Sequence, residues 1–329
     1  MKMVTGGCKN VVRSFVVILF FSFYVIDALK TVNNSVATSA PSSSGKGSSI
    51  GSSIRPVFPP PSETIGTSTS TTTTKSDEKK DDVSAASQRS SFIPVSNKAA
   101  VGMGMILAFN SGVINCSCLS GLLAEGVKQG TAAITGAFTN SAIGAASMLY
   151  SSSTTTSSAA ANQFILNGKC ILSYLGGSMI SGLIIPRPKA FELHIKKSLS
   201  IFVIAFGILT SASILADTSN INYLFLCCLA NGIQNSFTST LTANLCRTSH
   251  FTGTTSDMGT FLGQVLRGNM QNLSRLSSIF LLAISFWVGS FVSFGLTKSY
   301  GSTVLFGSAL IHLAFALYLV GLQTFRYRL

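Results

Sequence analysis

The sequence predicts an all-α protein: a polytopic transmembrane helical bundle built from two sequence-related halves and preceded by a disordered Ser/Thr-rich tail. Three observations support this class. Of the 329 residues, 47% are hydrophobic and only 10% are charged, whereas about a quarter of the residues in soluble domains are charged. Eight apolar segments follow Ala99, and two stretches about 120 residues apart repeat one motif. A chain of this composition cannot cover a water-soluble globule with polar side chains, so we expect most of it to lie in a lipid bilayer.

The eight apolar segments define a transmembrane domain of residues 98–329, with repeat halves at about 99–216 and 221–325. Most of them reach the roughly 20 residues that a spanning helix needs. The second and sixth carry more hydroxyls and glycines, so we expect short, tilted or broken helices that neighbours shield from lipid. The segments are residues 99–123, 131–150, 163–186, 198–216, 221–245, 252–266, 276–297 and 301–325.

The N-terminal region has two parts. In residues 1–30, three basic residues precede an apolar run from Ser14 to Ile26, which is typical of a signal peptide or an uncleaved signal anchor. Residues 31–97 are rich in Ser and Thr and too poor in apolar side chains to offset the entropy of ordering, so they are predicted to be a disordered tail. Both parts predict entry to the secretory pathway, with the plasma membrane or an endomembrane as the destination.

A motif occurs once in each half of the transmembrane domain. It consists of Gly-apolar-x-Asn in one apolar segment and Thr-Gly-x-x-(Thr/Ser)-(Asn/Asp) at the start of the next. In the third segment of each half, Gly176 and Gly182 match Gly289 and Gly295 in spacing. Repeated halves of a membrane protein commonly pack around a shared site. The motif glycines are assigned to backbone and packing roles: Gly112, Gly136, Gly232 and Gly253.

The polar side chains of the two motif copies form the predicted site for a small solute or ion. Side-chain amides can bind a ligand without the desolvation cost of a charge, and they can equally be hydrogen-bonded contacts between helices. Both interpretations stay open from the sequence. The predicted site residues are Asn115, Thr135, Asn140, Gln234, Asn235, Thr252 and Asp257.

Asp257 is the acidic member of this set. An ionisable group inside a membrane usually faces a cavity or a partner, which makes a functional role the first hypothesis. Arg247 and His250 lie just before it as candidate partners. The alternative is that Asp257 caps the N-terminus of a helix, where a carboxylate suits the helix dipole.

The second motif copy, from Ala230 to Asn235 and from Phe251 to Gly259, resembles a signature of the YoaK-like family over about residues 99–325. That resemblance implies a polytopic membrane protein and names no substrate. In the first copy, Asn115 stands where the resemblance leads us to expect Asp, and Ala137 stands where it leads us to expect Asn.

Other functional classes are disfavoured. The net charge of +13 comes from basic residues scattered between apolar runs, without the aromatic-interleaved basic face of a nucleic-acid binder. The seven cysteines and three histidines show no zinc spacing. Neither a nucleophile elbow nor a phosphate loop is present, so we predict no enzyme, no metal and no cofactor.

The leading functional hypothesis is a transporter of a small solute or ion, and the alternative is a non-transporting membrane scaffold or assembly protein. The expected partners are the lipid bilayer and an unidentified solute or ion, and the question of a homo-oligomer is left open. The basic loop from Arg187 to Lys197 is predicted to be cytoplasmic. With a lumenal tail, three spans would bring it there. An even number of spans per half predicts parallel repeats and an odd number predicts inverted ones.

Overall fold

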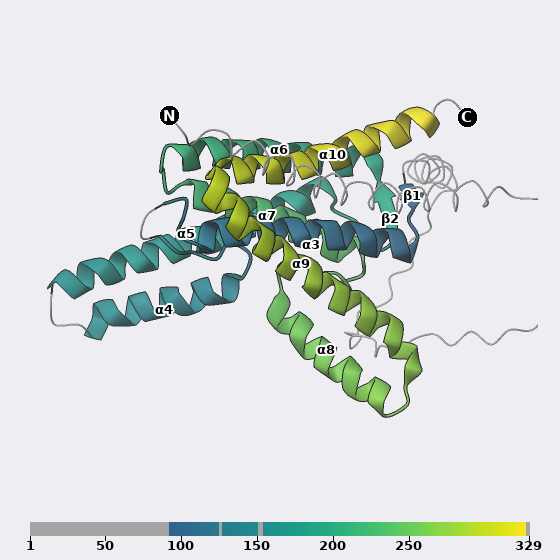
Figure 1. Cartoon of the computed structure of the whole chain (residues 1–329), viewed down its shortest axis with the longest axis horizontal. Helices are drawn as coiled ribbons and strands as arrows, with labels where there is room; N and C mark the ends of the chain where they lie inside the picture. The colour runs from purple at the N-terminus through teal and green to yellow at the C-terminus, as the bar shows by residue number, and fades with distance from the viewer. Residues whose placement is uncertain (1–91, 125–126, 151–153, 327–329) are drawn as a thin grey trace, which may run out of the picture. The chain divides into compact units, whose positions relative to one another are not determined.

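The computed structural model describes residues 92–124, 127–150 and 154–326, all of which belong to one compact unit of the chain. The signal segment and residues 31–91 of the predicted tail lie outside the described residues. The described elements (Figure 1) are β1 (Phe92–Pro94), α3 (Asn97–Leu119), α4 (Ile134–Tyr150), α5 (Thr154–Ile184), β2 (Glu192–His194), α6 (Ile195–Asp217), α7 (Tyr223–Leu241), α8 (Phe251–Leu266), the 3-10 turn η1 (Met270–Asn272), α9 (Leu273–Tyr300) and α10 (Thr303–Arg326).

The helical class predicted from the sequence is confirmed, because each of the eight apolar segments coincides with one α-helix in the described part of the chain. The predicted boundary between tail and transmembrane domain needs a correction. Residues 92–94, assigned to the tail, form strand β1, and α3 already begins at Asn97. The reason is that Ile93 and Val95 are apolar and pack against the helical core. The Ser96 hydroxyl then caps α3 by accepting the Ala99 N–H at 3.3 Å.

Four helices of the described chain are long and apolar enough to cross a membrane, so the protein is an integral membrane protein by these criteria. The spans are Asn97–Leu119, Ile195–Asp217, Met270–Tyr300 and Thr303–Thr324. Helices α4 and α8, the two segments expected to be weak, are uninterrupted but only 17 and 16 residues long. This is shorter than the roughly 20 residues of a perpendicular span.

Glycines let α3 and α9 touch backbone to backbone. A Cβ atom built on Gly112 would lie 2.2 Å from the carbonyl oxygen of Phe286, and one on Gly289 would lie 2.1 Å from that of Phe109. The Ser290 hydroxyl donates to the Gly112 carbonyl at 3.2 Å across the same crossing. Small residues at such a crossing are how membrane helices gain dispersion contacts when lipid tails are as apolar as their own side chains.

The crossing of α5 with α7 has the same construction. A Cβ atom on Gly177 would lie 2.0 Å from the Leu229 carbonyl oxygen, and one on Gly232 would lie 2.1 Å from that of Tyr174. The Ser178 hydroxyl donates to the Gly232 carbonyl at 3.2 Å.

The glycines in close contact differ by one residue from the pair matched in the sequence. Gly177, rather than Gly176, makes a close backbone contact like that of Gly289. The spacing partners Gly182 and Gly295 have no atom within 4 Å of a built Cβ among the described residues, so they make no close crossing there.

The third helix pair is α6 with α10, and their side chains interdigitate. Phe202 of α6 stacks on Phe315 of α10 with ring centroids 5.0 Å apart, and both lie in the largest buried cluster. At the other end of the pair, the Ser213 hydroxyl donates to the Ser302 carbonyl at 2.9 Å. Residue numbers therefore fall along α10 as they rise along α6, so these two helices run antiparallel.

The antiparallel pairing of β1 with β2 decides the topology of the first half. Strand β1 directly precedes α3 and β2 directly follows α5, so two paired strands must lie at the same membrane surface. Because the hydrocarbon core is about 30 Å thick, we expect the chain between them to cross it an even number of times. Of α3, α4 and α5, only α3 is among the candidate spans, and α4 is the shortest. The three spans expected from the sequence between the tail and the basic loop stay a prediction, and the paired strands favour an even number instead.

Cysteine labelling tests this topology. We expect a membrane-impermeant maleimide to reach Lys98→Cys and Ala190→Cys from the same side of the membrane, and Asn220→Cys only from the other side. All three positions are exposed, and the candidate span α6 separates the last two. The basic loop predicts that the shared side is cytoplasmic. Labelling of Lys98→Cys and Ala190→Cys from opposite sides would contradict the paired strands.

Candidate functional site

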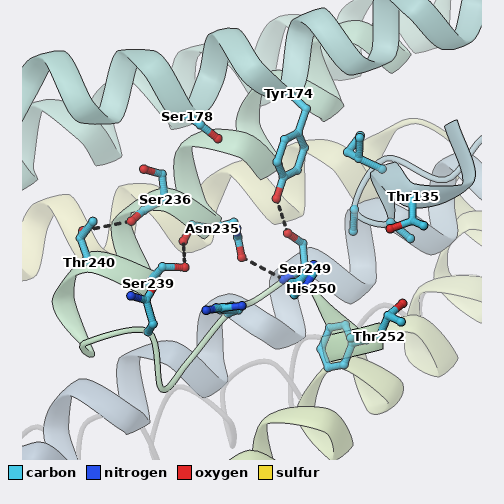
Figure 2. A pocket seen from close by; sticks show the side chains of 16 residues that line it. Thr135, Tyr174, Ser178, Asn235, Ser236, Ser239, Thr240, Ser249, His250 and Thr252 are labelled. Carbon is cyan, nitrogen blue, oxygen red and sulfur yellow. Dashed lines mark hydrogen bonds between the residues drawn. The ribbon is translucent and has the colours of Figure 1, made fainter. Parts of the chain in front are cut away.

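A polar cavity of about 460 Å³ lies between α5, α7 and the starts of α4 and α8 (Figure 2). The loop between α7 and α8 closes part of its wall. Ten of the side chains that line it carry a hydroxyl or an amide. The lining residues are Ala132, Ala133, Ile134, Thr135, Tyr174, Ser178, Asn235, Ser236, Ser239, Thr240, Asn244, Arg247, Ser249, His250, Phe251 and Thr252.

The cavity brings together three of the predicted site residues, Thr135, Asn235 and Thr252. Thr135 and Thr252 come from the Thr-Gly elements of the two motif copies and stand in the first turns of α4 and α8. Figure 2 shows both side chains at the same end of the cavity as Ser249 and His250. Residues separated by 117 positions in the chain therefore share one site.

Asn235 is held in place by the loop that precedes α8. Its side-chain oxygen accepts the backbone N–H of Ser249 at 3.2 Å. The Ser249 hydroxyl in turn is hydrogen-bonded to the Tyr174 hydroxyl, so α5, α7 and this loop are connected through polar side chains at the cavity wall (Figure 2). The amide nitrogen, for which the described residues supply no acceptor, is the donor that Asn235 offers to a ligand.

Asn115 occupies the corresponding place on α3 but lies outside the cavity. Its side-chain oxygen accepts two backbone N–H groups, from Thr131 and Ala132, each at 2.9 Å. Only 9% of Asn115 is exposed, and the bonds fix the chain just before α4. Its contacts are those of a structural anchor.

Gln234 lies in a buried network of polar side chains that connects α7 with α3 and α10. Its amide oxygen accepts from the Asn110 amide at 3.2 Å, and its amide nitrogen donates to the Leu107 carbonyl. Asn110 also accepts from the Ser308 hydroxyl and lies 3.4 Å from a ring nitrogen of His312. These are the interhelical hydrogen bonds of the second interpretation of the amides.

Asn140 and Asp257 do not line the cavity. Asn140 is half-buried on α4, and Asp257 is exposed on α8. Because α8 begins at Phe251, Asp257 lies beyond the first turn, and the N-cap position belongs to His250, which makes no side-chain cap bond. Asp257 is therefore not the N-cap of α8, as the alternative interpretation required. A functional role for Asp257 stays a prediction.

The Thr-Gly glycines differ from Gly112 and Gly232. A Cβ atom on Gly136 would have no atom within 4 Å among the described residues, so packing against these residues does not require a glycine at position 136. A Cβ atom on Gly253 would lie 2.8 Å from the His250 imidazole, which is the end of a side chain that can turn. Of the four motif glycines, only Gly112 and Gly232 are required by close backbone contact.

Sequence reasoning missed most of the cavity wall. Ser236, Ser239 and Thr240 follow Asn235 at helical spacing and form a polar stripe on α7, while Tyr174 and Ser178 stand one turn apart on α5. Those spacings are visible in the sequence, but which α5 face meets α7 is not.

No group of three His, Cys, Asp or Glu side chains within the described ranges is placed to hold a metal ion. The six cysteines of the described part of the chain are free thiols, five of them buried.

Comparison with known proteins gives one match. A family model described as a protein of unknown function, DUF1275, matches residues 96–318. The narrower YoaK-like assignment stays a prediction. No curated protein and no solved structure matches.

Proposed function

Because the chain belongs to the DUF1275 family, whose function is unknown, we propose from its own structure that it transports a small solute or ion across a membrane. The observation that carries the proposal is the polar cavity, whose wall includes the starts of both Thr-Gly helices, at Thr135 and Thr252. Transporters built from duplicated units commonly bind their substrate between the units, at helices that begin within the membrane. The four candidate spans supply the required membrane domain.

We also propose that the two halves are inverted repeats, with α3 to α6 equivalent to α7 to α10. Ser111 donates to Asn231 at 2.9 Å, and these positions are 120 residues apart, as are Gly112 and Gly232. A bond between equivalent positions is expected where a two-fold axis passes. Towards the N-terminus of α3, Leu107 contacts Gln234, so α3 and α7 run antiparallel, as α6 and α10 do. Inversion would require an odd number of spans per half, so one helix besides the two candidate spans of each half would have to cross the membrane.

The anchoring bonds support the same equivalence. Asn115 accepts the N–H of Ala132 before α4, and Asn235 accepts the N–H of Ser249 before α8. The two acceptors are 120 residues apart and the two donors are 117 apart, which are the offsets of the two motif elements. The halves differ in one hydrogen bond. In the first half, the Thr131 hydroxyl accepts from the Asn231 amide. In the second half, the equivalent hydroxyl of Thr248 is buried without a partner within the described residues, because the shorter Ser111 stands where the amide would have to be.

The scaffold alternative draws on the buried network of Gln234 and Asn110, which holds helices together without reaching the cavity. A scaffold requires only such networks, whereas a hydroxyl-lined cavity leaves polar groups without protein partners. These groups are available to bind a polar ligand in the cavity. Transport therefore accounts for more of the structure.

Uptake into proteoliposomes tests the proposal. Purified protein is screened with labelled inorganic anions, inorganic cations, amino acids and sugars, and we expect accumulation of one class over protein-free vesicles. Ser236→Leu places a bulky side chain in the cavity and should abolish that uptake, because the substrate would have to share its space. Ser211→Leu on the exposed face of α6 is the matched control and should leave uptake unchanged.

Absence of accumulation for every class, or unchanged uptake with a folded Ser236→Leu variant, would contradict transport through this cavity. The same assay tests Asp257. Asp257→Asn should fold normally, since the side chain is exposed, and loss of uptake in that variant would assign the carboxylate a role in coupling.

A further inference from the structure

The charge of the cavity wall is one-sided. Arg247 is a permanent cation in the wall and His250 is a second nitrogen base. None of the described residues that line the cavity is acidic. A guanidinium carries a positive charge and five N–H donors in a fixed fork.

Arg247 has no ion pair with any residue that the structure describes. Three carboxylates belong to that part of the chain, and each lies elsewhere. Glu192 pairs with Lys189 at 3.5 Å, Asp217 accepts from Ser302 at 3.2 Å, and Asp257 is exposed on α8 outside the cavity. Arg247 is half-buried and has no counter-charge among these residues, and an anion in the cavity would supply one.

The loop that carries Arg247 is held in a defined conformation. Ala243 and Asn244 adopt positive φ angles of 51° and 64°, which reverse the chain after α7. The Thr242 hydroxyl then accepts the Cys246 N–H at 2.9 Å, and Cys246 is buried against Gly104 of α3. The residue before Arg247 is thereby anchored in the core, so the fold fixes the backbone position from which the guanidinium reaches the cavity wall.

Most of the remaining polar groups of the wall can donate a hydrogen bond. The hydroxyls of Thr135, Ser236 and Thr252 have no hydrogen-bond partner among the described residues, and neither has the amide nitrogen of Asn235. A cation would need oxygen ligands with a negative partner close by, and here it would meet Arg247 instead. A ligand with several acceptor oxygens would satisfy the guanidinium, the amide and the hydroxyls together.

We propose that the cavity binds a small oxyanion, a carboxylate, phosphate or sulfate group, through Arg247 and the donors around it. This names the substrate class of the transporter proposed above and rests on the same cavity. The planar guanidinium matches two oxygens of such a group. The starts of α4 and α8 at the cavity add positive dipole ends. A volume of about 460 Å³ exceeds that of a single inorganic oxyanion, so a small organic acid also fits.

Binding to purified protein in detergent tests the inference without transport. Isothermal titration with sodium phosphate, sodium sulfate and sodium succinate should show saturable binding of at least one, and sodium chloride at equal ionic strength should not compete. Arg247→Gln should weaken that binding about tenfold or more, the range for losing a charged hydrogen-bond donor. Arg247→Lys, which keeps the charge but loses the two-pronged geometry, should fall between.

Arg267→Gln is the matched control, because Arg267 is exposed at the end of α8 and does not line the cavity. Its affinity should equal that of the unmodified protein. If Arg247→Gln does not fold, Thr135→Val removes a donor at the other wall and should also weaken binding. Absence of oxyanion binding, or equal affinity in folded Arg247→Gln, overturns the inference.

The binding experiment and the uptake experiment can fail independently, so the oxyanion inference and the transport proposal are tested separately. Oxyanion binding without uptake would keep the assigned ligand and remove transport. Uptake of a cation or a neutral solute without oxyanion binding would keep transport and remove the assigned ligand. Phosphate, sulfate and succinate as separate titrants distinguish an inorganic ligand from an organic acid.

Discussion

Gly177→Ala is expected to destabilise the membrane domain by about 3 kcal/mol or more, the upper range for an overpacked core. The added methyl group would lie 2.0 Å from the Leu229 carbonyl oxygen and 2.9 Å from its carbon, and these are backbone atoms that cannot turn away. Helices α5 and α7 must therefore separate, and the Ser178 bond to the Gly232 carbonyl stretches with them. Thermal unfolding in detergent should show a midpoint about 10 °C or more below that of the unmodified protein.

Gly182→Ala is the control on the same helix. A Cβ atom there meets nothing within 4 Å among the described residues, so alanine should be neutral or slightly stabilising through its higher helix propensity. The second crossing offers the same comparison, with Gly289→Ala expected to destabilise and Gly295→Ala expected to be tolerated. Equal midpoints for Gly177→Ala and Gly182→Ala would show that the two helices do not meet at this contact.

Asn115→Leu is expected to cost about 4 kcal/mol, because it removes one acceptor from two buried backbone donors at about 1–3 kcal/mol each. Thr131 and Ala132 are almost completely buried, so water cannot replace the lost acceptor. The entry to α4, and with it the cavity wall at Thr135, should lose its fixed position. Thermal unfolding measures the loss, and limited proteolysis between α3 and α4 should become faster.

Asn115→Asp separates this account from an effect of volume. A carboxylate keeps both acceptor positions and suits the N-terminal end of α4, so it should retain most of the stability. Asn235→Leu loses a single backbone bond, to Ser249, and should cost less than Asn115→Leu. An Asn115→Asp variant as unstable as Asn115→Leu would contradict the anchoring role.

The sequence predicted the helical membrane class and the positions of eight helices because both follow from local composition. Apolar segments of about 20 residues are recognisable without knowledge of their neighbours. The weakness of the second and sixth segments was also visible, and α4 and α8 are the short helices. The motif search found Thr135, Asn235 and Thr252 of the cavity, because matched polar positions in an apolar chain are rare.

The roles of the other predicted site residues could not be obtained this way. Asn115 and Asn235 occupy equivalent positions in the motif, yet only Asn235 faces the cavity. The difference lies in contacts with a distant segment, since Tyr174 supplies a hydroxyl at the wall where the other half has Phe286, which packs on Phe251. The sequence alone could not say which α5 or α9 residue would stand opposite each asparagine.

By itself the sequence determined where helices form, because helix length and apolar content are properties of neighbouring residues. Only the tertiary structure decided which glycines carry the crossings, that β1 pairs with β2, and that Arg247 stands beside the two Thr-Gly helices. Each of these depends on the register between segments far apart in the chain. That register depends on the close approach of helix backbones at Gly112, Gly177, Gly232 and Gly289, which no local pattern encodes.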